Sequence, residues 1–209
     1  YKDNPDTLPL LKSCLQKDEH EDVRSTAVEV FAEHYKDNPD TLPLLKSCLQ
    51  EDEHEDVRSA AVEVFAEHYK DNPDTLPLLK SRLQEDKHED VRSAAVEVLA
   101  RYYKKDPDTF VLLQACIQSN ESWEVRRAIV RTLGKNLSHE PRMFEFLCNC
   151  AINDPFERKN EWQDNPRQTA LKAILKHHRD NPRTLELLRD RAENDPEEQL
   201  REFAKRRLR

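Results

Sequence analysis

Apolar residues recur along the chain at the spacing of amphipathic helices, in short stretches separated by polar turns. Two such stretches occur within the first 34 residues: Leu8, Leu11, Cys14 and Leu15, then Val23, Ala27, Val30 and Phe31. Strand-forming residues never alternate with polar residues over any length. The pattern therefore predicts an all-α protein.

The two stretches belong to a unit of 34 residues that repeats along the chain. Tyr1, Tyr35, Tyr69 and Tyr103 open successive copies, and the first two copies differ at two positions only. Prolines keep the frame where later copies diverge, and the fifth copy carries a seven-residue insertion. The sequence thus divides into six units: 1–34, 35–68, 69–102, 103–136, 137–177 and 178–209. Because one helical hairpin cannot bury its apolar face alone, we expect the units to stack into a single α-solenoid domain over residues 1–209.

Each unit is predicted to be a helical hairpin with a short turn. Asp6 is the expected N-cap of the first helix, because Pro9 then falls in the first turn, where its missing N–H loses no hydrogen bond. The second helix is expected to begin between His20 and Asp22, where acidic side chains favour the positive end of the helix dipole.

The turn and the start of the second helix carry a recurring motif, in which an aspartate is followed five residues later by valine and then arginine. Its acids and arginines are Asp18, Asp52 and Asp86 with Arg24, Arg58, Arg92, Arg126, Arg167 and Arg201. This motif resembles the HEAT repeat. The resemblance implies a right-handed solenoid of six hairpins in which these residues form a ladder between adjacent units. Asn120 and the insertion between Asp154 and Arg167 depart from the pattern. Tetratricopeptide repeats share the period, but their Trp-x2-Leu-Gly-x2-Tyr pattern is absent.

Several longer phrases are similar to the C-terminal HEAT arrays of bacterial, often cyanobacterial, NACHT-type signalling ATPases of the STAND class. They are Asn-Pro-Asp-Thr-Leu at 4–8, Glu-Asp-Val-Arg-Ser at 21–25, Asp-Pro-Phe-Glu-Arg at 154–158, Asn-Pro-Arg-Gln-Thr-Ala at 165–170 and the closing stretch 195–209. This resemblance implies a sensor or scaffold in the C-terminal part of a longer chain. The first unit shows no polar substitutions of the kind an end cap needs, so we expect a segment before Tyr1.

Composition argues against catalysis. Gly134 is the only glycine, so dinucleotide-binding, Walker A, nucleophile-elbow and EF-hand motifs are excluded. Most cysteines and histidines are copied at fixed repeat positions, which places them on different layers, too far apart to share a metal ion. We therefore expect no enzyme activity, cofactor or metal.

No apolar run reaches the roughly 18 residues that cross a bilayer. The odd cysteine count, with no secretory leader, indicates a cytoplasmic protein.

Charge changes sign along two rows of the second helices. At one position the six copies carry Glu29, Glu63, Glu97, Arg131, Lys172 and Arg206, and four residues on they carry Glu33, Glu67, Arg101, Lys135 and Lys176. Because second helices line the concave side of HEAT arrays, the resemblance implies a groove that is acidic at one end and basic at the other. Such a groove would orient one protein or peptide partner, or another domain of the same chain. The alternative is an ordinary solvated helix face.

The insertion at 155–164 is the one irregular segment, and repeat insertions often bind partners. It carries Phe156, Arg158 and Trp162, residue types enriched at interface hot spots. In the alternative interpretation, Phe156 and Trp162 fold back to cover a wider gap between units.

Two rival functions belong to other classes. HEAT-like solenoids can hold nucleic acid along a basic face, but residues 1–102 contain 13 basic and 24 acidic side chains, against 21 and 18 in residues 103–209. The acidic half would repel phosphates, so nucleic acid is an unfavourable partner. Bilin lyases also use short HEAT-like repeats, although no feature of this sequence requires that activity.

Overall fold

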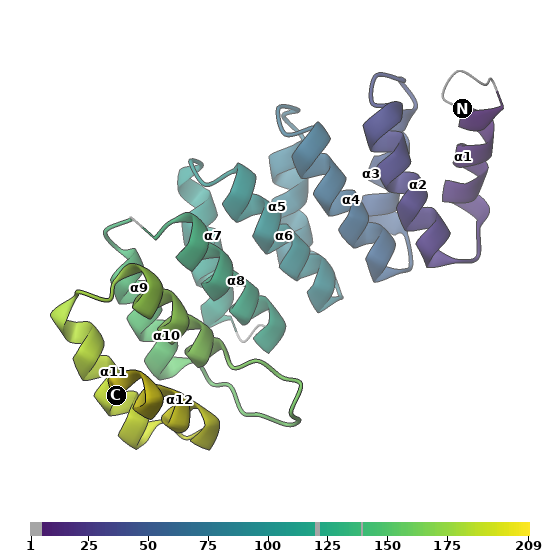
Figure 1. Cartoon of the computed structure of the whole chain (residues 1–209). Coiled ribbons are helices and arrows are strands. Elements are labelled where there is room, and N and C mark those ends of the chain that lie inside the picture. The colour runs from purple at the N-terminus through teal and green to yellow at the C-terminus, as the bar shows by residue number, and fades with distance from the viewer. Residues whose placement is uncertain (1–5, 120–121, 139) are drawn as a thin grey trace. The chain divides into compact units, whose positions relative to one another are not determined.

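The computed structural model describes residues 6–119, 122–138 and 140–209. Over these residues the secondary structure is entirely helical, as the sequence predicts, with twelve α-helices and no strand. The chain forms two compact structural units, each larger than the 34-residue sequence repeat. From here on, unit 1 is Tyr1–Thr109 and unit 2 is Phe110–Arg209. Figure 1 shows the helices of each unit, and the two units are described separately below.

Unit 1 consists of three near-identical hairpins. Its helices are α1 (Thr7–Lys17), α2 (Glu21–His34), α3 (Thr41–Glu51), α4 (Glu55–His68), α5 (Thr75–Glu85) and α6 (Glu89–Tyr102). The two helices of each hairpin pack together, and α2, α4 and α6 pack side by side in a row (Figure 1). Phe31 and Phe65 are fully buried at equivalent positions of α2 and α4. The repeated sequence thus places the same apolar side chains in the core of each hairpin.

The buried face of the second helix differs from the predicted stripe. In α2 the buried apolar residues are Ala27, Val28, Phe31 and Ala32, whereas Val23 is 38% exposed. The equivalent Val57 and Val91 are fully buried, because α2 packs against α4 and α4 against α6. Burial of this valine therefore depends on a preceding second helix, which the helical spacing alone does not encode.

The first helix begins where the sequence predicts, with Asp6 at the N-cap position of α1, but one part of the prediction is corrected. The Asp6 side chain does not cap the helix, since its backbone is already helical and an N-cap side chain reaches back from an extended backbone. In the next two copies the side chains of Asn38 and Asn72 accept the N–H groups of Asp40 and Asp74, each at 3.0 Å. The second helices begin where the sequence predicts, one residue after His20 in α2.

Unit 2 is the more divergent half. It holds most of α7 (Pro107–Gln118), then α8 (Trp123–Asn136), α9 (Met143–Asn153), α10 (Pro166–His177), α11 (Pro182–Asn194) and α12 (Glu198–Leu208). Helix α10 packs against both α8 and α9, and α11 packs against α12 (Figure 1). Ile129 and Leu133 of α8, Leu147 of α9, and Leu171 and Ile174 of α10 are all fully buried.

Gly134 lies where α8 and α10 approach closely. A Cβ atom at this position would stand 2.9 Å from the Cβ of Ala173, closer than carbon atoms in contact approach. The preceding three copies carry Ala32, Ala66 and Ala100 at this position. The single glycine therefore permits close packing of α8 on α10.

None of the helices in the described part of the chain is both long enough and apolar enough to cross a membrane.

Candidate binding surfaces

Within each unit, arginines of the second helices tie neighbouring hairpins together through buried ion pairs. Each guanidinium donates from two nitrogens to both carboxylate oxygens of an aspartate 28 residues later. The four pairs are Arg24–Asp52, Arg58–Asp86, Arg126–Asp154 and Arg167–Asp195, with N–O distances between 2.7 and 3.1 Å. This two-pronged geometry is the strongest form of carboxylate–arginine pairing.

The same arginines also bind the turn of their own hairpin. Arg58 Nη1 donates to the carbonyl oxygens of Asp52 at 2.8 Å and Glu53 at 3.0 Å. Arg92 and Arg201 donate in the same way to the carbonyls of Asp86 and Asp195. Asn120, which follows Arg92 by 28 residues, lies outside the described residues. Asp18 accepts the N–H of His20, so it supports its own turn.

Asp86 illustrates the electrostatics of these pairs. Burial opposes its ionisation, but the hydrogen bonds from Arg58 and from the backbone N–H of His88, together with the charges of Arg58 and Arg82, outweigh that cost. The pKa of Asp86 therefore lies below its ordinary value, and the pair is ionised at neutral pH.

A second row of ion pairs joins successive first helices of unit 1 to the turns that follow, and this pairing was not predicted from the sequence. Lys12, Lys46 and Lys80 reach Asp40, Asp74 and Asp106 at 2.6, 3.5 and 2.8 Å. The sequence does contain a signal for these pairs: each lysine precedes its aspartate by 26 to 28 residues, close to the 28-residue separation of the arginine–aspartate pairs. These pairs are partly exposed, and each contributes little to stability.

The acidic residues predicted to bind a partner gather on one surface of unit 1. Glu29, Glu33, Glu63 and Glu67 line a pocket of about 390 Å³ between α2 and α4. Ala60, Val64 and His68 complete its lining. We call this the acidic surface. Glu97 continues the same row on α6, where it is half-buried, and the exposed Arg101 lies one turn further along.

Burial and neighbouring carboxylates both act on Glu63. Loss of hydration and the charges of Glu97, Glu29 and Glu67 raise its pKa, against the opposing influence of Arg101. The ionised form of Glu63 is thus disfavoured in the folded protein, and a cationic partner would relieve this cost.

Glu63→Gln should raise the free energy of unfolding of unit 1 at pH 7 by about 0.5 kcal/mol, the size of a like-charge pair on a helix. A raised acid pKa contributes stability at low pH that is lost as pH rises through the folded value. The gain should therefore disappear near pH 4, as measured by urea denaturation. Glu53→Gln should give no gain at either pH, because the charge of Glu53 favours the ionised form of Arg24.

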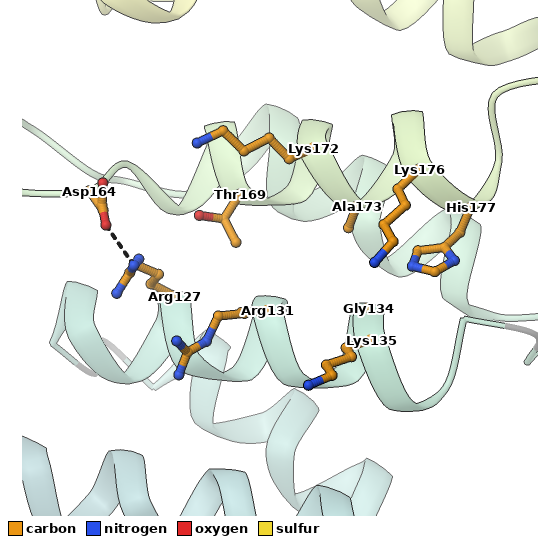
Figure 2. A pocket seen from close by; sticks show the side chains of 10 residues that line it. All are labelled: Arg127, Arg131, Gly134, Lys135, Asp164, Thr169, Lys172, Ala173, Lys176 and His177. Atoms are coloured by element: carbon orange, nitrogen blue, oxygen red, sulfur yellow. Dashed lines mark ion pairs between the residues drawn. The ribbon is translucent and has the colours of Figure 1, made fainter.

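The basic residues predicted in the same rows gather in unit 2. Arg127, Arg131 and Lys135 on α8 and Lys172 and Lys176 on α10 line a pocket of about 310 Å³. Figure 2 shows the Lys176 side chain extending toward α8, whereas the Lys172 side chain points away from α8. Thr169, Gly134, Ala173 and His177 complete the lining together with Asp164, which pairs with Arg127 at 2.6 Å. We call this the α8–α10 pocket. Arg127 was not predicted from the sequence as part of this surface, although it lies one helical turn before Arg131.

A second pocket of about 300 Å³ adjoins the first. Lys172 and Lys176 line both pockets, and Arg179, Arg207, Leu175 and Phe203 complete the second one, between α10 and α12. Arg206, the predicted member of the row, is exposed on α12 but lines neither pocket, because its neighbour Arg207 faces α10 instead. Together the two pockets form the basic surface.

The two aromatic residues of the insertion differ in burial. Phe156 is 4% exposed and packs edge-on against the ring of Trp123. Arg158 stacks on Phe156 and forms an ion pair with Glu197. Trp162, in contrast, is 83% exposed. The expectation that both aromatic residues fold back thus describes Phe156 and not Trp162, because the polar segment 159–163 carries Trp162 away from the core.

The sequence pattern of HEAT repeats matches residues 1–66 and 76–162. The chain belongs to the HEAT-repeat family. HEAT repeats commonly serve as scaffolds for protein–protein interaction. A comparison with curated proteins finds no match.

Two cysteines of this HEAT protein, Cys48 and Cys150, are buried. Burial and the nearby charge of Asp52 raise the pKa of the Cys48 thiol to about 12, and burial with Asp154 does the same for Cys150. Both thiols are therefore protonated and weakly nucleophilic at neutral pH. Within the described residues, no group of three or more histidine, cysteine, aspartate or glutamate side chains is arranged to hold a metal ion.

Proposed function

We propose that this HEAT protein is a non-catalytic scaffold or sensor module that binds proteins through its second helices. One observation carries the proposal: four glutamates line the pocket of unit 1, and five cations line the α8–α10 pocket of unit 2, where the one carboxylate, Asp164, is paired with Arg127. The buried arginine–aspartate ladder lies elsewhere in the hairpins, so the glutamates and lysines that line these pockets are not members of it. Surfaces of one sign accelerate association with partners of the opposite sign.

The two surfaces suit different segments of a partner. The acidic surface suits a basic segment, and the basic surface suits an acidic one. We further propose that the hairpins continue as one right-handed solenoid, on whose concave side the two surfaces would orient a single partner. Residues 103–209 carry only a small net positive charge and residues 1–102 are strongly acidic, which disfavours a long nucleic acid as that partner.

The wider context of the module is a separate part of the proposal. The phrases at 4–8, 154–158 and 165–170 support a place in a larger cytoplasmic NACHT-type ATPase of bacteria. There the scaffold would bind a ligand or another domain of the same chain. Sequencing the gene upstream of the codon for Tyr1 tests this: an encoded NACHT domain supports the context, and a stop codon or an unrelated domain contradicts it.

Short fluorescein-labelled oligoglutamate and oligolysine peptides test the binding surfaces by anisotropy with the whole chain. Both should bind, and the dissociation constants should rise at least about tenfold between 0.05 and about 0.3 M salt, because exposed charges are screened beyond a few ångströms. Lys172→Glu should weaken oligoglutamate binding about tenfold and leave oligolysine binding unchanged.

Arg189→Glu is the matched control, since Arg189 is exposed on α11 and lines neither basic pocket. It should change oligoglutamate binding less than twofold. Equal losses from Lys172→Glu and Arg189→Glu would mean that only net charge matters, and the proposed surface would be wrong.

A further inference from the structure

The α8–α10 pocket concentrates more positive charge than an ordinary helix surface. Five of its lining side chains are cationic, and the single carboxylate, Asp164, is already paired with Arg127. Lys135 and Lys176 form no ion pair with any residue that the structure describes, and Lys172 lies over the ring of Phe203 at 6.0 Å. Most of this charge is therefore not balanced by carboxylates lining the pocket.

The spacing of the cations works against the stability of their own helices. Arg127, Arg131 and Lys135 are four residues apart on α8, and Lys172 and Lys176 are four residues apart on α10. Like charges at this spacing lie on one helix face and repel. Figure 2 shows the two rows on facing helices, with the Lys176 side chain extending into the gap between them. A bound anion would relieve repulsion within both rows at once.

The chemistry of the donors favours a phosphate group over a single carboxylate. A phosphorylated side chain carries close to two negative charges at neutral pH and offers three acceptor oxygens, whereas a carboxylate carries one charge and two oxygens. Lysine and arginine are the residues that proteins use to bind phosphate. Arg131, Lys135, Lys172 and Lys176 are all exposed, so a group carried on a protein segment can reach them.

The adjoining pocket indicates how the rest of such a segment could lie. Lys172 and Lys176 are shared by both pockets, and the second pocket adds Leu175 and Phe203 beside Arg179. An extended segment with a phosphate in the α8–α10 pocket would place its next side chains over this apolar and basic floor.

We propose that the α8–α10 pocket binds a phosphorylated serine or threonine in an acidic segment of a partner protein. The proposal rests on the proposed function, since it specifies the ligand of the basic surface.

The test compares three short fluorescein-labelled acidic peptides that differ at one residue: phosphoserine, glutamate or serine. Anisotropy with the whole chain should give a dissociation constant at least about tenfold lower for phosphoserine than for glutamate. Lys135→Gln, which alters only the α8–α10 pocket, should reduce that ratio to near one. Arg179→Gln, which alters only the second pocket, should preserve it. Thermal unfolding monitored by circular dichroism checks that both variants are folded.

The outcomes separate the two proposals. Equal binding of the phosphoserine and glutamate peptides overturns the phosphate pocket and leaves the acidic-segment scaffold standing. Failure of all three peptides to bind overturns both. A single-stranded oligonucleotide of similar charge that binds more tightly than the phosphopeptide, and loses affinity equally in both variants, identifies a nucleic-acid surface and also overturns both.

Discussion

Arg58→Ala should lower the free energy of unfolding of unit 1 by about 3–5 kcal/mol, as expected when one partner of a buried ion pair is removed. Arg58 and Asp86 are both almost completely buried, and two hydrogen bonds of 2.9 Å join them. The variant leaves the Asp86 carboxylate buried beside only the more distant guanidinium of Arg82, at 3.7 Å. It also removes the donor to the carbonyls of Asp52 and Glu53. Urea denaturation followed by circular dichroism measures the loss.

Arg201→Ala provides the matched control for this loss. Arg201 occupies the same repeat position, but it donates to the carbonyls of Asp195 and Pro196, and the side chain is half-buried. Its replacement should cost about 1 kcal/mol, the net value of a hydrogen bond. If both variants lose the same stability, pairing across hairpins contributes nothing and the ladder is not what holds unit 1 together.

The acid sensitivity of unit 1 should depend on the same pair. Because the pKa of Asp86 is lowered in the folded state, its contribution is present above the ordinary aspartate pKa of about 3.9 and is lost as pH falls below that value. The difference in unfolding free energy between the original chain and the Arg58→Ala variant should therefore shrink as pH falls from neutrality to below about 4.

Phe156→Ala should destabilise unit 2 by about 3–5 kcal/mol, the usual cost of truncating a buried phenylalanine. The ring packs against Trp123 and under the guanidinium of Arg158. Its backbone is held as well, since its N–H donates to Asp154 and its carbonyl accepts from Arg167. The variant therefore leaves a cavity beside a segment that cannot easily collapse. Urea denaturation again measures the change.

Trp162→Ala is the natural comparison, because it removes a larger aromatic ring from the same insertion. Trp162 is 83% exposed, so its loss should change stability by less than about 0.5 kcal/mol. A Trp162→Ala variant as unstable as Phe156→Ala would show that the insertion folds over Trp162 in solution, against the structure.

Repetition explains how much of this fold the sequence could predict. Near-identical copies specify the same helix bounds. The start of α2, and the division of each copy into two helices, therefore follow from the sequence of a single repeat. The ladder residues were identifiable because arginine and aspartate recur at fixed positions. Repetition does not encode the neighbours of each copy: Val23 and Val57 share a local sequence yet differ in burial, since within residues 6–209 a second helix, α2, packs before α4 and none is described before α2.

The candidate sites were predictable to a smaller extent. Four residues of the charge rows, Arg131, Lys135, Lys172 and Lys176, line one pocket. The rows missed Arg127 and Arg207 and included Arg206, because one residue of displacement turns a helical side chain by about 100°. In the insertion there was no period to fix the register, so composition alone could not assign Phe156 to the core and Trp162 to the surface.

The Asp86 carboxylate stabilises its own turn by accepting the N–H of His88, and it also accepts a hydrogen bond from Arg58 of the preceding hairpin. One carboxylate is thus common to two adjacent hairpins, so the opening of either removes a bond from the other. Within a unit, the smallest segment that can open by itself should therefore be longer than one repeat. A partner that clamps a single hairpin would slow hydrogen exchange in the next one as well.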